Sequence, residues 1–358
     1  MEVVYDEESI AGYMRAAVGV TPDRPILIDR FLNHAMECEA DAISDGTHAF
    51  VPAVMEHIEL AGVHSGDSAC IIPSRHISEE NVKTIKEYTR KIAEEMGVKG
   101  LMNMQYAIEK DKVYVLEANP RASRTVPLVS KVCNIRMVPL AIDIVTSELT
   151  GRTSPVPHLK ERSIPYYGVK EAVFPFNMFQ EVDPVLGPEM RSTGEVLGLS
   201  QFYGEAFFKA QEATQTKLPM GGSVLISVCE KDKAELAEIA KGFDEAGFKI
   251  YATQGTQKAL ADAHIVSEFV YKISEGGRPN TTDLITNGKI DLIINTPIGA
   301  DGTADDSYLR KAAIRKKIPY ITTMAAAKAT VSGIESMNKP GCGVVRSLQE
   351  LHEMIQEI

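Results

Sequence analysis

The chain has 358 residues, 44% of them hydrophobic, which is enough for about two cored domains at the usual ~150 residues each. Its net charge is −11, and no Lys/Arg-rich run appears, which argues against a nucleic-acid groove. No apolar stretch approaches the roughly 18 residues of a membrane span, and the N-terminus has no signal-peptide character. The 5 cysteines are scattered and form no CxxC pair, so neither a disulfide framework nor a zinc site is indicated. These features predict a cytoplasmic enzyme with no nucleic-acid or membrane partner.

The first part of the chain alternates strands and helices before it reaches an acidic strand. We expect a strand at residues 2–5, a helix over 6–17 and strands over 25–29 and 36–43. In the last strand, Glu37, Glu39 and Asp41 share one face. Three carboxylates on one face form either a solvated sheet edge or a site for a ribose and a metal, and the pattern leaves both open. Because the alternation starts at once, we expect a further layer upstream of Met1.

A glycine-bracketed loop and a capped helix follow. A strand over 49–55 leads to residues 62–66 (GVHSG), whose glycines let main-chain groups approach a ligand. Ser78 is the expected N-cap of an amphipathic helix that stops at Gly97. Its expected inward residues are Val82, Ile85, Ile92 and Met96.

Two strands joined by a short charged turn, residues 101–108 and 112–119, carry the strongest sign of a site. Alternate strand positions point to one face, and here that face holds Asn103, Gln105, Glu117 and Asn119. Oxygen-bearing side chains in this arrangement favour a hard cation such as Mg²⁺ or Mn²⁺, which takes its other ligands from phosphate and water. Arg121 and Arg124 follow and offer forked donors to phosphate oxygens. The opposite face is expected to be core: Met102, Met104, Tyr106 and Ile108. The segment predicts a metal–nucleotide phosphate site; the alternative is an ordinary solvated face of an antiparallel sheet.

The second half of the chain has the rhythm of a parallel sheet. Prolines mark turns between about 150 and 215, with a strand over 170–176 and a helix over 204–213. We predict an α/β protein in which residues 1–213 form one domain, 214–222 a linker and 223–358 a doubly wound parallel-sheet domain. The strands expected in the second domain are 224–228, 249–253, 269–273, 290–296, 320–323 and 343–346. The helices expected there are 231–246, 257–263, 281–286, 305–316, 324–336 and 348–355.

Hydroxyl and amide residues lie at the ends of three of these strands. They are Thr253 with Thr256, Asn295 with Thr296, and Thr322 with Thr323. Ligands of parallel sheets bind at the carboxyl ends of the strands, where helix N-termini offer unpaired N–H groups. With Lys233 and Lys272 as cations, these ends predict a phosphate pocket; the alternative is that they are ordinary helix caps.

Four long motifs are similar to those of one known family. They are residues 55–69 (MEHIELAGVHSGDSA), 100–107 (GLMNMQYA), 117–127 (EANPRASRTVP) and 187–196 (GPEMRSTGEV). Together they resemble the C-terminal part of the large chain of carbamoyl phosphate synthetase, over essentially the whole chain. The resemblance implies the back of the second ATP-grasp unit, an α+β fold, followed by a regulatory domain similar to methylglyoxal synthase.

In that family, the second unit uses ATP to phosphorylate carbamate to carbamoyl phosphate, for arginine and pyrimidine biosynthesis. The positions that match adenine and ribose contacts are Arg30, Leu32 and Glu37, and the loop along the nucleotide matches Gly62, Val63, His64 and Ser65. Gln105, Glu117 and Asn119 match ligands of Mg²⁺ or Mn²⁺, with K⁺ as a further candidate ion. Arg121 and Arg124 match arginines set against the phosphates and the acyl group. The catalytic residues implied are Asn119, Arg121 and Arg124.

The resemblance also implies partners and regulation. The family's preceding α/β domain and glycine-rich loop would lie before Met1, so we expect the chain to need the remaining N-terminal part of the large chain, with the glutaminase small subunit. Positions that match a nucleotide effector site, for UMP or IMP, are Lys233, Thr253, Thr256, Lys272 and Asn295. Pro297 replaces a hydroxyl residue of that pattern. Positions that match the binding of ornithine are Glu59, Asp67, Glu171 and Thr322.

Two classes of function remain open. The chain is either a catalytic fragment that works when complemented, or a non-catalytic module in which residues 215–358 sense a nucleotide. Methylglyoxal formation by the second domain is not expected, because residues 275–280 (EGGRPN) lack the Gly-Gly-Asp motif of that enzyme.

Overall fold

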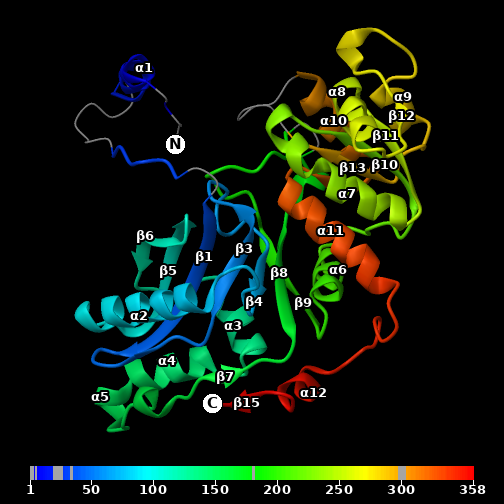
Figure 1. The fold of residues 1–358 in the computed structure, drawn as a ribbon. Coiled ribbons are helices and arrows are strands. Elements are labelled where there is room, and N and C mark those ends of the chain that lie inside the picture. Colours follow the sequence, from blue (N-terminus) through cyan, green and yellow to red (C-terminus); the bar gives the residue numbers. More distant parts are fainter. Residues whose placement is uncertain (1–3, 5, 19–26, 33–34, 180–181, 297–303) are drawn as a thin grey trace.

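A computed structural model describes residues 4, 6–18, 27–32, 35–179, 182–296 and 304–358. In this part of the chain the first half builds an antiparallel sheet with the strand order β6-β5-β1-β3-β4-β8-β9, and β2 pairs with β1 (Figure 1). Its strands are β1 (Met36–Asp45), β2 (Ala49–Phe50), β3 (Val54–Leu60), β4 (Cys70–Ile72), β5 (Lys99–Glu109), β6 (Lys112–Asn119), β8 (Tyr167–Val173) and β9 (Gly194–Ser200). The helices of this half are α1 (Glu7–Val18), α2 (Glu79–Glu95), α3 (Val126–Val132), α4 (Met137–Val145), α5 (Ser147–Thr150) and α6 (Tyr203–Ala213).

The acidic strand β1 lies in the middle of this sheet, between β5 and β3. One of its faces packs under α2 in a core shared with β5, and the buried Met102, Met104 and Tyr106 confirm the apolar face predicted for that strand. Glu37, Glu39 and Asp41 lie on the opposite face and are at most 5% exposed. The solvated-edge interpretation of these carboxylates is therefore wrong, because their strand is central and covered on both faces.

Helix α2 begins and ends where its capping residues predict. The Ser78 side chain accepts a hydrogen bond from the Asn81 N–H, and Gly97 follows the helix with a left-handed φ of +60°. Met96, predicted to point inward, is instead 52% exposed, because it lies at the C-cap where the helix has already ended. Among the residues described, no helix is long and apolar enough to cross a membrane.

The second sheet is parallel, with the order β12-β11-β10-β13-β14. Its strands are β10 (Gly222–Ser227), β11 (Phe248–Ala252), β12 (Glu268–Phe269), β13 (Leu292–Asn295) and β14 (Tyr320–Ile321). Its helices are α7 (Lys233–Glu245), α8 (Gln254–Asp262), α9 (Thr281–Thr286), α10 (Ala304–Lys316) and α11 (Met324–Met337). Val224 and Ile226 face the core with α7, α8 and α11, whereas Leu225 faces the core with α9 and α10. Helices on both faces confirm the predicted doubly wound arrangement.

Several predicted elements are shorter or absent. The strand predicted over 343–346 is wrong: Gly341 and Gly343 have left-handed φ values of +89° and +79°, which a strand does not accommodate. The strand predicted over 269–273 is limited to β12, because a 3₁₀ turn begins at Ile273. Residues 27–29 form no strand, residues 25 and 26 lie outside the described part, and so do residues 2, 3 and 5.

The end of the chain returns to the first sheet. After α11 the chain forms α12 (Leu348–His352) and β15 (Gln356–Glu357), which pairs with β7 (Arg162–Ser163). Leu351 is buried in the same core as α3 and α4. Helix α11 also packs along α6 (Figure 1), so closely that a Cβ on Gly204 would lie 2.1 Å from the Ser332 carbonyl oxygen. The two halves are thus tied by both α11 and the C-terminal segment.

Candidate active site and regulatory cavities

The β5–β6 hairpin brings the predicted metal ligands together. The strand register places Gln105 opposite Glu117 and Asn103 opposite Asn119. Asn119 Nδ2 donates to Glu117 Oε1 at 2.8 Å, and Gln105 Nε2 donates to Ser65 Oγ at 3.0 Å. The hairpin therefore meets the glycine-bracketed loop, as a nucleotide site built from both would require.

The chemistry of these side chains fits a hard cation. Gln105 and Asn119 each use the amide nitrogen as a donor, which leaves their carbonyl oxygens to act as ligands. Glu117 is exposed and adds a carboxylate at the open face of the hairpin. Asn103 is different: it is 2% exposed and donates to Glu39 and Asp41. Gln105, Glu117 and Asn119 are thus the three side chains that could hold a hard cation, and the buried Asn103 supports the carboxylates of β1.

The acidic face of β1 forms the floor of this site, and its carboxylates have altered proton affinities. Burial raises the pKa of Glu37, a shift that His57 and a backbone hydrogen bond from Gly62 oppose. Burial and the neighbouring Glu39 raise the pKa of Asp41 to about 6. Burial alone would raise the pKa of Glu39, but His57 and nearby Lys170 lower it overall. Negative charge at the floor is thus partly neutralised before any ligand arrives.

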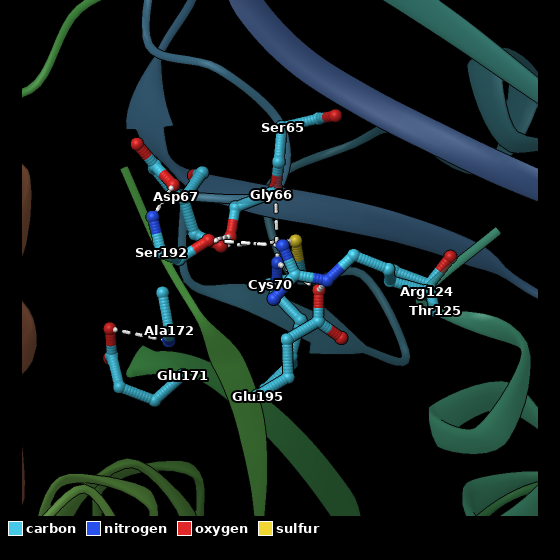
Figure 2. Close-up of polar contacts among 12 residues, drawn as sticks. Ser65, Gly66, Asp67, Cys70, Arg124, Thr125, Glu171, Ala172, Ser192 and Glu195 are labelled. Atoms are coloured by element: carbon cyan, nitrogen blue, oxygen red, sulfur yellow. Dashed lines mark hydrogen bonds and ion pairs between the residues drawn. The ribbon is translucent and has the colours of Figure 1, made fainter. Parts of the chain in front are cut away.

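Side chains of His64 and Lys170 hold the loop over residues 62–68 in one shape through hydrogen bonds to its backbone. The Gly66 N–H donates to His64 Nδ1 at 3.0 Å, so the neutral imidazole carries its proton on Nε2. Lys170 Nζ, from β8, donates to the Ser65 carbonyl at 3.0 Å. A Cβ on Gly66 would lie 3.0 Å from Met190 Sδ and 3.3 Å from Arg124 Nη1, so only glycine fits there without displacement. Ser65, Gly66 and Arg124 are seen around this contact in Figure 2.

Both predicted arginines are exposed, but Arg124 is held by Ser192 and Glu195, whereas Arg121 contacts its sequence neighbour. Arg124 Nη1 donates to Ser192 Oγ at 3.1 Å, and its Nε lies 3.3 Å from Glu195 Oε1 (Figure 2). Lys170 Nζ lies 3.8 Å from the same Glu195 oxygen. Arg121 is exposed and donates to the Ala122 carbonyl.

Sequence reasoning missed Lys170, Ser192 and Glu195. Burial opposes the charge of Lys170, but Cys70, Glu195 and Glu39 offset it and raise the Lys170 pKa. The available signal was a lysine in the strand YGVKEAV, where a buried lysine is costly unless it is paired.

The positions expected to hold adenine are less closely gathered. Arg30 Nη2 lies 3.3 Å from Glu109 Oε2 at the end of β5, and its side chain is 74% exposed. Leu32 and Val63 are half-buried. Glu37 pairs with Ala107 on β5, two positions before Glu109. Arg30 and Glu37 thus lie toward the turn of the hairpin, with Arg30 on Glu109 and not on the predicted metal ligands.

The four residues predicted to bind ornithine line one cavity of about 460 Å³. The cavity lies between the two halves, and Glu59, Asp67, Glu171 and Thr322 are all part of its wall. Burial and the neighbouring Glu59 raise the pKa of Glu171 to about 7, although a hydrogen bond from the Ala172 N–H opposes the rise. Burial also raises the pKa of Glu59, whose Oε2 has no hydrogen-bond partner among the described residues. Two buried carboxyls with raised pKa values favour a cationic ligand.

Asp67 is already engaged. Its two carboxylate oxygens accept from the N–H groups of Arg191, at 2.7 Å, and Ser192, at 2.9 Å. This residue therefore links the wall of the cavity to the contact between Ser192 and Arg124.

The carboxyl ends of the second sheet bring most of the predicted effector residues together. Thr253 Oγ1 donates to Ser227 Oγ at 3.1 Å, Thr256 Oγ1 accepts from the Val228 N–H, and Asn295 Nδ2 donates to the Ser227 carbonyl. Lys233 begins α7 at the same edge and pairs with Glu230. Lys272 follows β12, where its backbone N–H donates to Glu275. Pro297 lies outside the described residues.

Comparisons with known proteins agree with this geometry. Residues 1–150 match the family model "Carbamoyl-phosphate synthase L chain, ATP binding domain", and residues 235–322 match "MGS-like domain". The protein named "Carbamoyl phosphate synthase large chain, C-terminal section" from Aquifex aeolicus is 45% identical over 371 residues, covering 99% of this chain and 69% of that one. The chain belongs to the carbamoyl phosphate synthase large-chain family.

Other members of the family show how much of it the chain represents. The "Carbamoyl phosphate synthase large chain" of Archaeoglobus fulgidus is 48% identical over 354 residues, which cover 99% of this chain and 32% of that one. The C-terminal section from Methanocaldococcus jannaschii is 46% identical, with 99% and 59% coverage. The chain thus spans about a third of the length of the A. fulgidus large chain that it matches. The predicted resemblance is confirmed, and the match to the family's ATP-binding domain agrees with a nucleotide site in the first half.

Proposed function

We propose that this chain forms one wall of an ATP site that phosphorylates carbamate to carbamoyl phosphate, and that it acts together with the N-terminal part of the large chain and the glutaminase small subunit. The observation that carries this proposal is the cluster of Gln105, Glu117 and Asn119, which meets Ser65 of the glycine-bracketed loop. We place the protein in the cytoplasm, in the supply of carbamoyl phosphate for arginine and pyrimidine synthesis.

The arrangement addresses a problem of charge. Carbamate is already an anion, so no proton has to be removed, but it must approach the negatively charged γ-phosphate of ATP. A Mg²⁺ or Mn²⁺ ion held by Gln105, Glu117 and Asn119 would neutralise phosphate charge when bound. Arg124 adds a guanidinium whose direction is set by Ser192 and Glu195 before the substrate arrives. Such preorganised donors stabilise the charge that develops on the transferring phosphoryl group.

The proposal is tested by complementation. The chain is mixed with the N-terminal part of the large chain from the same source, and carbamoyl phosphate formation is measured with ammonia, bicarbonate and ATP. Activity should require both parts and should fall by about 100-fold or more with Glu117→Gln, as expected for loss of a charge that acts on the transition state. An unchanged rate with Glu117→Gln would favour the alternative, a non-catalytic nucleotide-sensing module.

The two other groups of residues support regulation of this site. We assign the cavity lined by Glu59, Asp67, Glu171 and Thr322 to a cationic amino acid, with ornithine as the candidate. We assign the edge formed by Lys233, Thr253, Thr256, Lys272 and Asn295 to a nucleoside monophosphate of the UMP or IMP type. Calorimetric titration of the chain with ornithine and with UMP tests each assignment separately, since Glu59→Gln should weaken the first ligand and leave the second unchanged.

A further inference from the structure

Arg310 forms a buried ion pair between the two halves of the chain. It lies on α10 and is 0% exposed. Its Nε and Nη2 each lie 2.8 Å from one carboxylate oxygen of Asp183, which comes from the loop between β8 and β9. Its Nη1 donates to Asn295 Oδ1 at 2.8 Å. A forked pair with three bonds in a buried place fixes both partners in direction as well as in distance.

On one side of Arg310 the contacts lead to the proposed active site. The backbone carbonyl of Asp183 accepts a hydrogen bond from the Arg191 side chain. The N–H groups of Arg191 and Ser192 donate to the Asp67 carboxylate, and Ser192 Oγ donates to the Gly66 carbonyl at 2.9 Å. The same Ser192 hydroxyl accepts from Arg124. The loop that Arg310 holds is therefore the loop that positions Arg124; its contacts with Asp67 and Gly66 are drawn in Figure 2.

On the other side the contacts lead to the proposed nucleotide edge. Asn295 ends β13, and its Nδ2 donates to the Ser227 carbonyl at 3.2 Å and to Asp306 Oδ1 at 2.9 Å. Ser227 in turn accepts from Thr253. Both N–H groups of the Asn295 amide are used, so a ligand that accepts a hydrogen bond from this amide has to take the place of Ser227 or Asp306. Because Arg310 donates to the oxygen of the same amide, any turn of the amide changes the contact of the guanidinium.

We propose that Arg310 is a positioning residue that carries the state of the nucleotide edge to residues 182–193, and through them to Asp67 and Arg124. This inference rests on the proposed effector function of that edge and adds the path by which effector binding reaches the active site. This path needs no motion of a whole domain. Its side chains are joined by successive hydrogen bonds, so the loss of one bond frees the next side chain to move. Asp183 contributes because it is the anionic partner that keeps the buried guanidinium compensated.

The experiment compares the chain with its Arg310→Lys variant, which keeps the charge and loses the fork. Hydrogen exchange of the peptide over residues 187–193 is measured without ligand and with UMP as the probe, and UMP affinity is measured by calorimetry. In the unmodified chain UMP should change exchange across 187–193. In Arg310→Lys this response should be lost while UMP affinity stays within about threefold, and exchange without ligand should already be faster. Lys316→Arg, an exposed exchange on the same helix, is the control and should behave as the unmodified chain.

Asp183→Asn keeps the test decisive if Arg310→Lys fails to fold. It removes the partner from the less buried side, since the Asp183 side chain is 27% exposed, and it should abolish the same response. The route is refuted if UMP binds but exchange across 187–193 does not change in the unmodified chain. It is also refuted if UMP changes this exchange in Asp183→Asn and Arg310→Lys as much as in the unmodified chain. In both cases the assignment of the nucleotide edge to an effector is unaffected. If UMP does not bind the unmodified chain, the effector assignment fails and the route fails with it.

Discussion

Replacing Glu171 with glutamine should make the stability of the chain less dependent on pH. Burial, with Glu59 nearby, raises the pKa of Glu171 from an ordinary value of 4.5 to about 7. A carboxyl with a raised pKa in the folded state stabilises the fold below its unfolded pKa, and this contribution is lost as the pH rises through the folded pKa. The difference corresponds to about 3 kcal/mol, at about 1.4 kcal/mol per pH unit. Glutamine at this position keeps an oxygen for the contacts of Glu171 with Ala172 and Gln211 but carries no charge.

The assay is denaturant unfolding at pH 5 and pH 8. Between these values the unmodified chain should lose about 2.5 kcal/mol more of its free energy of unfolding than Glu171→Gln does, since pH 5 already lies slightly above the unfolded pKa. Glu95→Gln, at an exposed position of α2, is the matched control and should follow the unmodified chain. Parallel pH dependences of the unmodified chain and Glu171→Gln would refute the reasoning, since they would mean that Glu171 titrates alike in the folded and unfolded states.

Three further predictions concern the same regions. Ornithine should bind more tightly as the pH rises from 6 to 8, because the carboxyl of Glu171 must be ionised to pair with a cation; calorimetry in buffers of different ionisation enthalpy should show proton release, and equal affinity at both pH values would contradict the assignment. Gly204→Ala should destabilise the chain by about 1–3 kcal/mol in thermal or denaturant unfolding, because the added Cβ would lie 2.1 Å from the Ser332 carbonyl, whereas Gly12→Ala, with nothing within 4 Å, is the control. Gly66→Ala should displace Met190 and Arg124 and so lower the rate of phosphoryl transfer in the complemented enzyme, beyond any effect of a lower free energy of unfolding. A lower free energy of unfolding with an unchanged rate would count against a role of the Gly66–Arg124 contact in catalysis.

Much of the geometry of the proposed cation site could be predicted because its residues are neighbours in sequence. A hairpin with a short turn places alternate residues of both strands on one face, so Gln105, Glu117 and Asn119 follow from period-2 geometry. The second sheet could also be predicted from the sequence, because regular alternation of strands and helices predicts parallel pairing. The carboxyl ends of those strands then bring Thr253, Thr256 and Asn295 together.

The parts of the site that the sequence did not predict depend on contacts between distant parts of the chain. Arg310 and Asp183 are 127 positions apart, and Lys170 and Ser65 are 105 apart, so no local pattern links either pair. Local pattern also failed at Val344 and Val345, whose β preference is overridden by left-handed glycines beside them. The sequence alone could not show that the carboxylates of β1 are buried. That follows from the central position of the strand in the sheet, since carboxylates on an edge strand would have been solvated.

The central claim is that Glu117, with Gln105 and Asn119, holds the metal–nucleotide at which phosphoryl transfer occurs. It is tested most directly by the reverse reaction, the formation of ATP from carbamoyl phosphate and MgADP, in the complex of this chain with the N-terminal part of the large chain. Glu117→Gln should lower this rate by about 100-fold or more, while Glu95→Gln leaves it unchanged. ATP formation at the unmodified rate by the Glu117→Gln complex would contradict the account.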